Sequence, residues 1–308
     1  MEAEPMWKGD IIMMNGELMP FADASIHPLS LAVTYATTVF EGLRAYHVPD
    51  TNQFSLFRVE EHLKRLKVGM KVMRFGDTYD SQYLTECLTN LIRANKPNSD
   101  VYIRLLVYIE GQGMLATTGP VGFTAAAMPR KKSAFAEHGM SLGVSSWRRL
   151  SDNASPPRIK ATANYHNARL AVHEAKLDGY DGALMLTPDD YVSEAPIACF
   201  FMVRDGELIT PSCTSNILES ITRDTIITRY QEITGNQVEQ RSIDRSELYF
   251  ADEAFLCGTG QEIIPVTSID HFSLGDGNIG PITNNIRQDY FTIVRDPNAD
   301  HKEWRTLI

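Results

Sequence analysis

The sequence predicts a mixed α/β (α+β) protein of two domains. Its 308 residues are 43% hydrophobic and 22% charged, which is typical of a globular protein long enough for two medium-sized domains. Apolar, strand-like segments and amphipathic, helix-like segments both recur along the whole chain. A polar, irregular segment at residues 129–139 separates two such series. We therefore predict a small N-terminal α/β domain at residues 1–128, a linker at residues 129–139 and a large C-terminal domain at residues 140–308.

Charge and composition exclude several classes of function. The net charge of −10 offers no basic stripe, so we expect neither nucleic acid nor a membrane as a partner. The first ten residues lack the positive start and apolar run of a signal peptide, and no apolar run reaches the ~18 residues of a membrane span. Cys87, Cys199, Cys213 and Cys257 are scattered without metal-binding spacing. We expect reduced thiols, no metal and a cytoplasmic location.

The N-terminal domain begins with a predicted β-hairpin at residues 10–17, which turns at Asn15-Gly16. Periodicity then predicts strands at residues 54–57, 100–109 and 124–128 and helices at residues 59–69 and 81–95. Arg58 lies between a strand and a helix, where its guanidinium could bind a phosphate. The alternative is a surface ion pair with Glu60 or Glu61.

The strand at residues 100–109 carries a charged residue in its interior. Arg104 must find a partner or point into a cavity, unless the strand lies at a sheet edge and Arg104 faces water. Tyr102 and Arg104 are two residues apart, so they share one face of the strand.

The C-terminal domain contains the segment around which the function is organised. After Pro156-Pro157, residues 159–161 are extended, and a helix runs from about residue 164 until Gly179 stops it. Further predicted elements are strands at residues 140–147, 183–186, 191–192, 199–203, 238–241 and 253–257, a short helix at 244–248, turns at 258–263 and 275–280 (the latter in a hairpin), and a closing helix at 282–294.

Lys160 is flanked by Ile159 and Ala161 and has no acidic neighbour in sequence. A lysine in apolar surroundings loses proton affinity and can attack carbonyls, including that of pyridoxal phosphate. The alternative is an ordinary solvated lysine. The helix that opens near Ile221 offers a phosphate site at its N-terminus, or is simply a capped helix start.

The run I-K-A-T-A-N-Y-H-N-A-R-L-A at residues 159–171, followed by V-S-E-A at residues 192–195, resembles the core of the class IV (fold-type IV) aminotransferases, and most closely their branched-chain members. The resemblance implies pyridoxal 5′-phosphate as the cofactor. It assigns Lys160 to the covalent bond with the cofactor, Glu194 to the pyridine nitrogen and Tyr165 to the phenolic oxygen. A carboxylate at that nitrogen keeps it protonated, so the ring can accept electrons.

Further family motifs assign the remaining cofactor contacts. The match F-R-x-x-E-H-L-x-R-L implies that Arg58 binds the phosphate. I-T-R implies the same role for Ile221 and Thr222, with Ser220 in place of the usual glycine. The turn G-T-x-x-E-I implies that Thr259 binds the phosphate and that Gly260 lies at the substrate carboxylate.

The resemblance also implies a substrate pocket. It places Tyr35 and Phe40 at the substrate side chain, with Tyr35 reaching the site of a neighbouring subunit, although Ala36 replaces the usual glycine. The pair Tyr102 and Arg104 corresponds to the substrate-carboxylate contacts of the branched-chain enzymes. Met114 belongs to a G-x-G-M loop that closes over the pocket. Arg130 stands where the family has an aromatic residue above the substrate.

The implied activity is ping-pong transamination of Leu, Ile and Val with 2-oxoglutarate by a homodimer or higher homo-oligomer. Arg130, and Cys199 in place of an asparagine, keep open an (R)-amine or D-amino acid transaminase. Ala195 and Pro196 also depart from the family pattern. Two further functions stay open: a lyase of the kind that splits aminodeoxychorismate, and a protein that binds the cofactor without catalysis.

Overall fold

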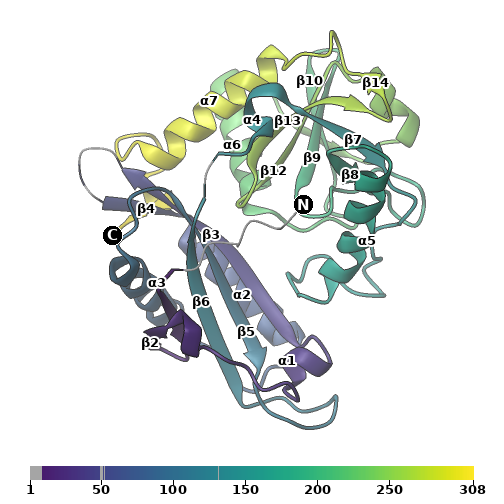
Figure 1. Cartoon of the computed structure of the whole chain (residues 1–308). Coiled ribbons are helices and arrows are strands. Elements are labelled where there is room, and N and C mark those ends of the chain that lie inside the picture. Colours follow the sequence, from purple (N-terminus) through teal and green to yellow (C-terminus); the bar gives the residue numbers. More distant parts are fainter. Residues whose placement is uncertain (1–8, 49–50, 52, 131) are drawn as a thin grey trace. The chain divides into compact units, whose positions relative to one another are not determined.

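The structure is a computed structural model that describes residues 9–48, 51, 53–130 and 132–308, and these form two compact units (Figure 1). The first unit comprises Met1–Lys131, Ile159–Ala163 and Ile293–Ile308, and the second comprises Lys132–Arg158 and Asn164–Thr292. The division into residues 1–128, 129–139 and 140–308 stays a prediction. The contacts place Lys160, which that division gave to the C-terminal domain, with the first unit.

The first unit is built on an antiparallel seven-stranded sheet in the order β15-β4-β3-β5-β6-β1-β2. Its strands are β1 (Ile11–Met14), β2 (Glu17–Pro20), β3 (Thr38–Val48), β4 (Gln53–Phe57), β5 (Val101–Ile109), β6 (Val121–Pro129) and β15 (Arg305–Leu307). The turn at Asn15-Gly16 joins β1 and β2 as predicted, with both residues at positive φ.

Two helices, α2 (Val59–Val72) and α3 (Ser81–Asn95), pack their apolar faces on this sheet. Leu63 and Leu66 of α2 and Leu88 of α3 join Leu43 and Leu105 of the sheet in one buried core. Along β5, residues that face this core alternate with half-buried residues on the other face. The short elements of the unit are η1 (Phe21–Asp23), α1 (Leu31–Thr34) and η3 (Lys302–Trp304).

The second unit is built on a mixed sheet in the order β11-β10-β9-β12-β13-β7-β8, with β14 paired to β13. Its strands are β7 (Met140–Val144), β8 (Gly182–Leu184), β9 (Cys199–Arg204), β10 (Glu207–Pro211), β11 (Glu239–Arg241), β12 (Glu253–Gly258), β13 (Glu262–Ile269) and β14 (Phe272–Ser273). Its helices are α4 (Phe135–His138), α5 (Asn164–Leu177), α6 (Ile221–Thr234), η2 (Arg245–Phe250) and α7 (Pro281–Arg295), whose last three residues belong to the first unit.

Most of the predicted elements are confirmed, and α3 has the predicted bounds. Three expectations were wrong in detail. Residues 275–280 lead from β14 into α7 and do not turn a hairpin. Tyr191 and Val192 form only isolated bridges. The predicted linker contains a short helix, α4. The strands β3, β10, β13 and β15 were not predicted as separate elements.

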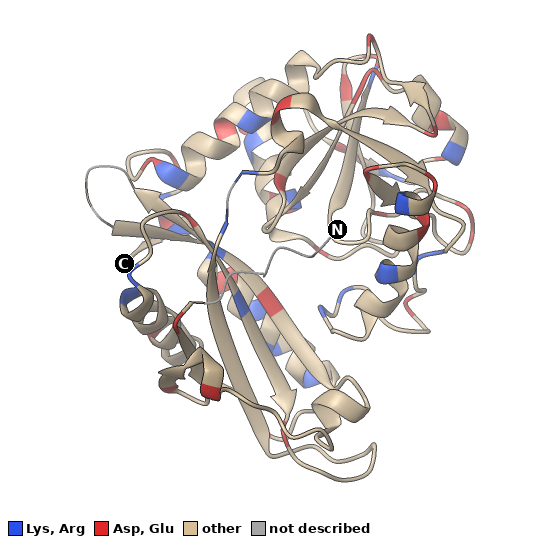
Figure 2. Cartoon of the chain, viewed as in Figure 1, with Lys and Arg blue, Asp and Glu red and all other residues tan. Residues whose placement is uncertain are grey.

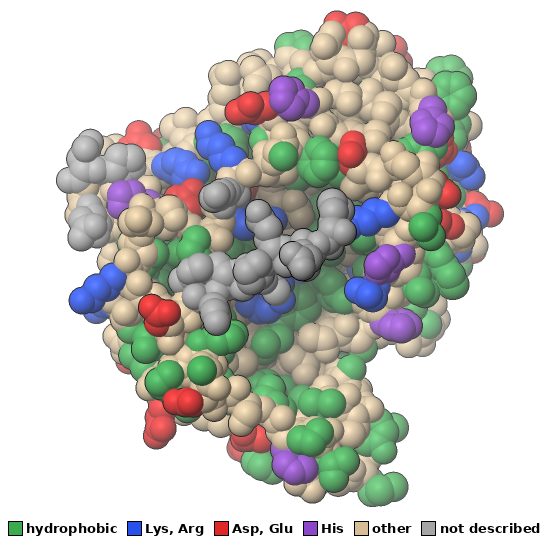
Figure 3. Space-filling model, in the orientation of Figure 1, with side chains coloured by type: hydrophobic (Ala, Val, Ile, Leu, Met, Phe, Trp, Pro, Cys, Tyr) green, Lys and Arg blue, Asp and Glu red, His purple; other side chains and the backbone are tan. Residues whose placement is uncertain are grey.

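Basic and acidic side chains are interspersed over each unit (Figures 2 and 3). Cys87, Cys199, Cys213 and Cys257 are all free thiols, and Cys213 alone is not buried. None of the helices in the described parts of the chain has the length and apolar composition of a membrane span.

Candidate active site

Lys160 lies on an extended segment that is hydrogen-bonded to β3 within the first unit. Phe40 N–H donates to Lys160 O over 2.9 Å, Thr162 N–H donates to Thr38 O over 3.0 Å, and Val39 and Ala161 form an antiparallel bridge. β5 pairs with Thr38–Ala45 along one edge of β3. On the other edge, β4 pairs only with Ala45–Val48, so the lysine segment pairs with the earlier part of β3 on that edge. The lysine is therefore fixed by backbone pairing.

The half-buried side chain of Lys160 lies over an aromatic ring. Its Nζ is 4.7 Å from the ring centroid of Phe40, which is itself buried. A residue and its directly opposite partner lie on the same face of an antiparallel pair, which agrees with this contact. An ammonium over a ring face is attracted by the ring quadrupole. The Phe40 ring thus holds the amine at one face of β3.

The same face carries the two residues predicted to bind the substrate carboxylate. In the register of β3 and β5, Phe40 is opposite Leu106 and Gly42 is opposite Arg104. The ring of Tyr102 lies across Gly42, because a Cβ at residue 42 would overlap the Tyr102 hydroxyl. The guanidinium carbon of Arg104 is 5.9 Å from the centroid of that ring. The structure therefore brings Phe40, Tyr102 and Arg104 onto one face with Lys160.

Arg104 does not lie on an edge strand, so the alternative in which it faces water at an edge was wrong. Its strand, β5, pairs with β3 on one side and β6 on the other. Its side chain is half-buried, and its Nε is buried without a hydrogen-bond partner among the described residues. Buried donors of this kind are normally satisfied by water or by a ligand.

Arg58 caps the N-terminus of α2 in a left-handed conformation, with φ of 51°. This conformation is uncommon for residues other than glycine and is often found at functional sites. The guanidinium packs over Trp304 at 4.6 Å, and its Nε donates to Glu61 Oε1 over 2.7 Å. Arg58 therefore does form an ion pair with Glu61, as the alternative interpretation expected. The pair is not a surface pair, however, because Arg58 is buried. Its phosphate role stays a prediction.

In the second unit, Glu194 is a buried carboxylate surrounded by donors. Arg149 Nη2 donates to its Oε1 over 2.7 Å, and Leu218 N–H donates to the same oxygen over 3.2 Å. The Cys199 thiol donates to Oε2 over 3.6 Å. Burial raises the pKa of Glu194, and the charge of Arg149 opposes this rise. Arg149 therefore offsets part of the cost of burying the carboxylate.

Sequence reasoning missed Arg149 and underestimated Cys199. Arg149 appears in sequence only as part of Arg148-Arg149, and a basic pair after a strand gives no sign of a buried partner 45 residues later. A thiol is a poorer hydrogen-bonding group than the asparagine that the family has at residue 199. Even so, the Cys199 thiol bridges Glu194 and the carbonyl of Leu218, at 3.6 Å from each. It therefore orients the same carboxylate.

The N-terminus of α6 begins three residues after Leu218. Ser220 is the N-cap, and its side chain accepts from Arg223 N–H over 3.3 Å. Ile221 and Thr222 open the helix and are both buried. The first-turn amides of a helix have no partner within the helix and lie at its positive dipole end. The bond between Leu218 and Glu194 thus brings this helix start close to the buried carboxylate.

The turn that carries Thr259 and Gly260 connects β12 to β13. It follows Cys257, which is directly opposite Cys199 in the register of β9 and β12. The structure therefore associates this turn with the side of the sheet that holds Glu194. Tyr165 is half-buried in the first turn of α5.

The structure leaves three predicted substrate residues on exposed positions. The exposed fractions are 48% for Tyr35 and 78% for Met114, and Arg130 is also exposed. Tyr35 caps the short helix α1, and Arg130 N–H donates to Asp100 O. Their roles at the substrate stay predictions.

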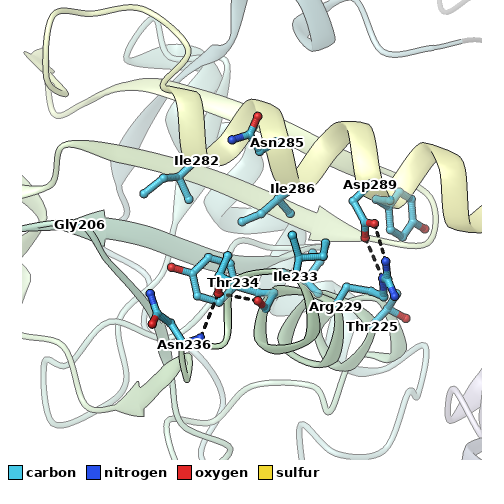
Figure 4. Close-up of a pocket in the computed structure, with 13 residues that line it drawn as sticks. Gly206, Thr225, Arg229, Ile233, Thr234, Asn236, Ile282, Asn285, Ile286 and Asp289 are labelled. Carbon is cyan, nitrogen blue, oxygen red and sulfur yellow. Dashed lines mark hydrogen bonds and ion pairs between the residues drawn. The ribbon is translucent and has the colours of Figure 1, made fainter. Parts of the chain in front are cut away.

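A pocket of about 240 Å³ in the second unit lies between α6 and α7 (Figure 4). Its apolar walls are Ile226, Ile233, Ile282 and Ile286. An ion pair between Arg229 and Asp289 links α6 to α7, with Nη2–Oδ1 and Nε–Oδ2 distances of 2.7 and 3.0 Å. None of the predicted site residues lines it. We therefore do not assign the reaction to this pocket.

The residues present fit the predicted cofactor. The first unit supplies an amine over an aromatic ring and the buried guanidinium of Arg58 at the start of α2. The second supplies a buried carboxylate, a helix N-terminus and Arg149, whose Nε is buried without a partner in the described ranges. An amine, a carboxylate and phosphate-binding donors are the groups that a phosphorylated pyridine aldehyde requires.

Comparisons with known proteins extend over both units. Residues 38–269 match the family described as amino-transferase class IV. A probable branched-chain-amino-acid aminotransferase of Aquifex aeolicus is 36% identical over 303 residues, which cover 97% of each chain. The branched-chain amino acid aminotransferase of Thermobaculum terrenum in its PLP form is 38% identical with a TM-score of 0.92, over 97% of this chain and 98% of that one. The corresponding enzyme of T.th., complexed with N-(5′-phosphopyridoxyl)-L-glutamate, is 34% identical with a TM-score of 0.91, over 97% and 98%.

Proposed function

We propose that this chain, which belongs to the class IV aminotransferase family, is a pyridoxal 5′-phosphate enzyme that transfers the amino group of branched-chain L-amino acids. The observation that carries the proposal is the amine of Lys160, which backbone pairing with β3 holds over the ring of Phe40. An amine in partly apolar surroundings is suited to bond with a carbonyl.

When bound, pyridoxal phosphate supplies the aldehyde carbon that takes up the amino group and an aromatic ring that withdraws electrons. Lys160 Nζ would hold the cofactor aldehyde, and it would carry the proton that leaves the substrate Cα. Glu194 holds a proton on the ring nitrogen, and Arg149 and Cys199 keep its carboxylate in place. Tyr165 contacts the phenolic oxygen of the cofactor.

We propose phosphate-binding roles for residues that each unit supplies by itself. Arg58 supplies a guanidinium, and Ile221 and Thr222 supply the amides of a helix N-terminus. Thr259 adds a hydroxyl from the turn between β12 and β13. The buried position of Arg58 supports this role, because a buried guanidinium is little screened by water.

Substrate selection is assigned to the face of β3 and β5 that holds Lys160. Arg104 and Tyr102 bind the carboxylate, Gly260 adds a backbone amide, and Phe40 provides an apolar wall for the aliphatic side chain. Met114 and Arg130 lie on exposed segments that could cover the substrate. We propose 2-oxoglutarate as the acceptor, in a ping-pong sequence, and this is supported by the L-glutamate adduct of the T.th. enzyme.

The assembly is proposed to be a homodimer or a higher homo-oligomer. The exposed ring of Tyr35 supports this, because a substrate residue exposed in one chain can be covered by a second. The free thiols of all four cysteines support a cytoplasmic location.

Spectra of the purified protein with single substrates test this function. We expect visible absorbance of the lysine-bound cofactor, and borohydride should abolish it by reducing the bond to Lys160. In protein that has not been reduced, L-leucine should bleach this absorbance and 2-oxoglutarate should restore it. Lys160→Ala removes the bond and should leave no reducible, covalently bound cofactor. D-alanine and (R)-1-phenylethylamine should leave the spectrum unchanged, and bleaching by either in place of L-leucine would assign the enzyme to a rival substrate class. A wild-type spectrum that L-leucine does not change would contradict the proposal.

A further inference from the structure

A buried charged cluster lies between β3 and α2, on the face of β3 opposite Lys160. The Glu41 carboxylate is fully buried and receives both nitrogens of the Arg65 fork, with Nε–Oε1 and Nη2–Oε2 distances of 2.7 Å. His62 Nδ1 lies 2.7 Å from Glu41 Oε2, and the histidine is 1% exposed. Three polar side chains thus form one compact network in the apolar core.

This cluster connects the two residues assigned to the cofactor in the first unit. On β3, Glu41 follows Phe40, whose N–H donates to Lys160 O and whose ring lies under the lysine amine. On α2, His62 N–H donates to Arg58 O over 3.2 Å. A continuous path of bonds and contacts therefore runs from Lys160 through Phe40, Glu41 and His62 to Arg58.

The fold itself does not require charges at this place. Burying an ion pair costs desolvation, and replacing such a pair with apolar residues of similar volume is often neutral or stabilising. The leucines of α2 already hold the helix against the sheet. A network of directional bonds does what apolar packing does poorly, because it fixes the register and rotation of α2 relative to β3.

We propose that Glu41, His62 and Arg65 are positioning residues that hold Arg58 at a fixed distance from Lys160, so that one ligand can meet both. The inference rests on the proposed function, because it takes the ligand to be the phosphorylated cofactor. The imidazole of His62 and the fork of Arg65 bind Glu41 from α2, one turn and two turns after Arg58, respectively. A shift of α2 would move Arg58 away from the lysine segment while leaving the lysine on β3.

Cofactor affinity tests this inference without relying on catalysis. Glu41→Gln keeps the shape of the side chain and removes its charge. We expect the apo-protein of this variant to bind pyridoxal phosphate on the order of 10-fold more weakly than the wild type. Pyridoxal, which lacks the phosphate, should bind both proteins with affinities within about twofold, since its bond to Lys160 does not involve Arg58. Arg65→Lys keeps the positive charge and loses the two-nitrogen fork. It should therefore show a smaller loss of affinity for pyridoxal phosphate, again with little change for pyridoxal.

The matched control breaks an ion pair of the same two-bond geometry elsewhere. Asp289→Asn removes the partner of Arg229 between α6 and α7, outside the proposed cofactor site. We expect this variant to bind pyridoxal phosphate as the wild type does, although it is destabilised. Removing both charges in Glu41→Gln/Arg65→Gln should leave the phosphate-specific loss in place, because the network stays broken.

Four results would overturn the inference. The first two are an unchanged affinity for pyridoxal phosphate in both single cluster variants, and equal losses of affinity for pyridoxal and for pyridoxal phosphate. The third is a loss as large in the Asp289→Asn control. The fourth is recovery of the affinity for pyridoxal phosphate in the double variant, which would show that the balance of charge matters and the position of α2 does not. A wild-type protein that binds no pyridoxal phosphate would reject the proposed function, and the inference with it. The two failures are therefore distinguishable.

Discussion

Glu194 shows how a single residue combines a structural cost with a chemical role. Its carboxylate is buried and bound by Arg149, Leu218 and Cys199. The carboxylate can hold a proton on a ring nitrogen only if it keeps its charge, and burial alone disfavours that charge. Arg149 offsets part of this cost, so the two residues should be tested together.

We predict that Glu194→Gln separates stability from activity when combined with Arg149→Met. The single variant leaves a buried guanidinium without its partner, so its free energy of unfolding should fall by about 3–5 kcal/mol. Turnover should fall by at least ~10²-fold, because a neutral amide cannot stabilise a protonated ring. The double variant removes the unpaired charge, and denaturant unfolding should show recovered stability while turnover stays low. Recovery of turnover together with stability would show that Glu194 acts only structurally.

Residue types alone predicted some positions of the site and not others. Arg104 inside an apolar strand had to find a partner or a cavity, and its half-buried position with an unsatisfied Nε agrees with that reasoning. Glu41 within V-F-E-G carries the same signal, a charge in an apolar run. His62 and Arg65 are three residues apart and so lie on one helix face, which is consistent with a shared partner but does not identify it.

At the scale of elements, the buried cluster between α2 and β3 should make the free energy of unfolding depend on pH in the acidic range. Burial raises the pKa of Glu41, but the charge and hydrogen bonds of Arg65 and the hydrogen bond of His62 outweigh it and lower this pKa from 4.5 to about 2. Burial lowers the pKa of His62 from 6.5. Both groups bind a proton more weakly in the folded state than in the unfolded chain. Their stabilisation is therefore complete above pH 6.5, and is lost as the pH falls, first through His62 and below pH 4.5 through Glu41.

Glu41→Gln should remove the lower of these two windows. Urea unfolding at a series of pH values between about 6 and 3.5 should give a shallower decline for the variant than for the wild type, with slopes that differ below pH 4.5 by up to ~1.4 kcal/mol per pH unit. Carboxylates distant from this cluster titrate equally in both proteins, so the difference reports Glu41 together with its partner His62. Parallel curves would show that the carboxylate is not stabilised by α2.

Local pattern predicted elements better than it predicted their partners. The apolar stripe of α3 fixed its bounds, and the turn residues Asn15-Gly16 fixed the first hairpin. The pairing of the lysine segment with β3 joins Val39 to Ala161, and no periodicity within either segment encodes so distant a contact. Residues 275–280 were misleading because glycines favour turns in general, and a turn does not by itself show that two paired strands flank it.

At the scale of the whole molecule, the exposed position of Tyr35 makes the number of chains part of the mechanism. A tyrosine that serves a substrate pocket should be partly buried, yet its exposed fraction is 48%. The proposed homodimer accounts for this if each Tyr35 completes the site of the other chain. In a two-fold dimer, such an exchange is reciprocal.

We predict that two defective variants will restore activity when they are combined in one dimer. Lys160→Ala lacks the reactive amine, and Tyr35→Ala should have a raised KM for L-leucine. In a heterodimer of the two, one site has both defects, and the other combines Lys160 of one chain with Tyr35 of its partner. Heterodimers purified through two different tags should therefore show about half of the wild-type activity per dimer, with a wild-type KM. If Tyr35 serves its own chain, the remaining Lys160 site carries the Tyr35→Ala defect, and the raised KM persists. The KM of the heterodimer thus decides between the two arrangements even if the Tyr35→Ala defect is modest.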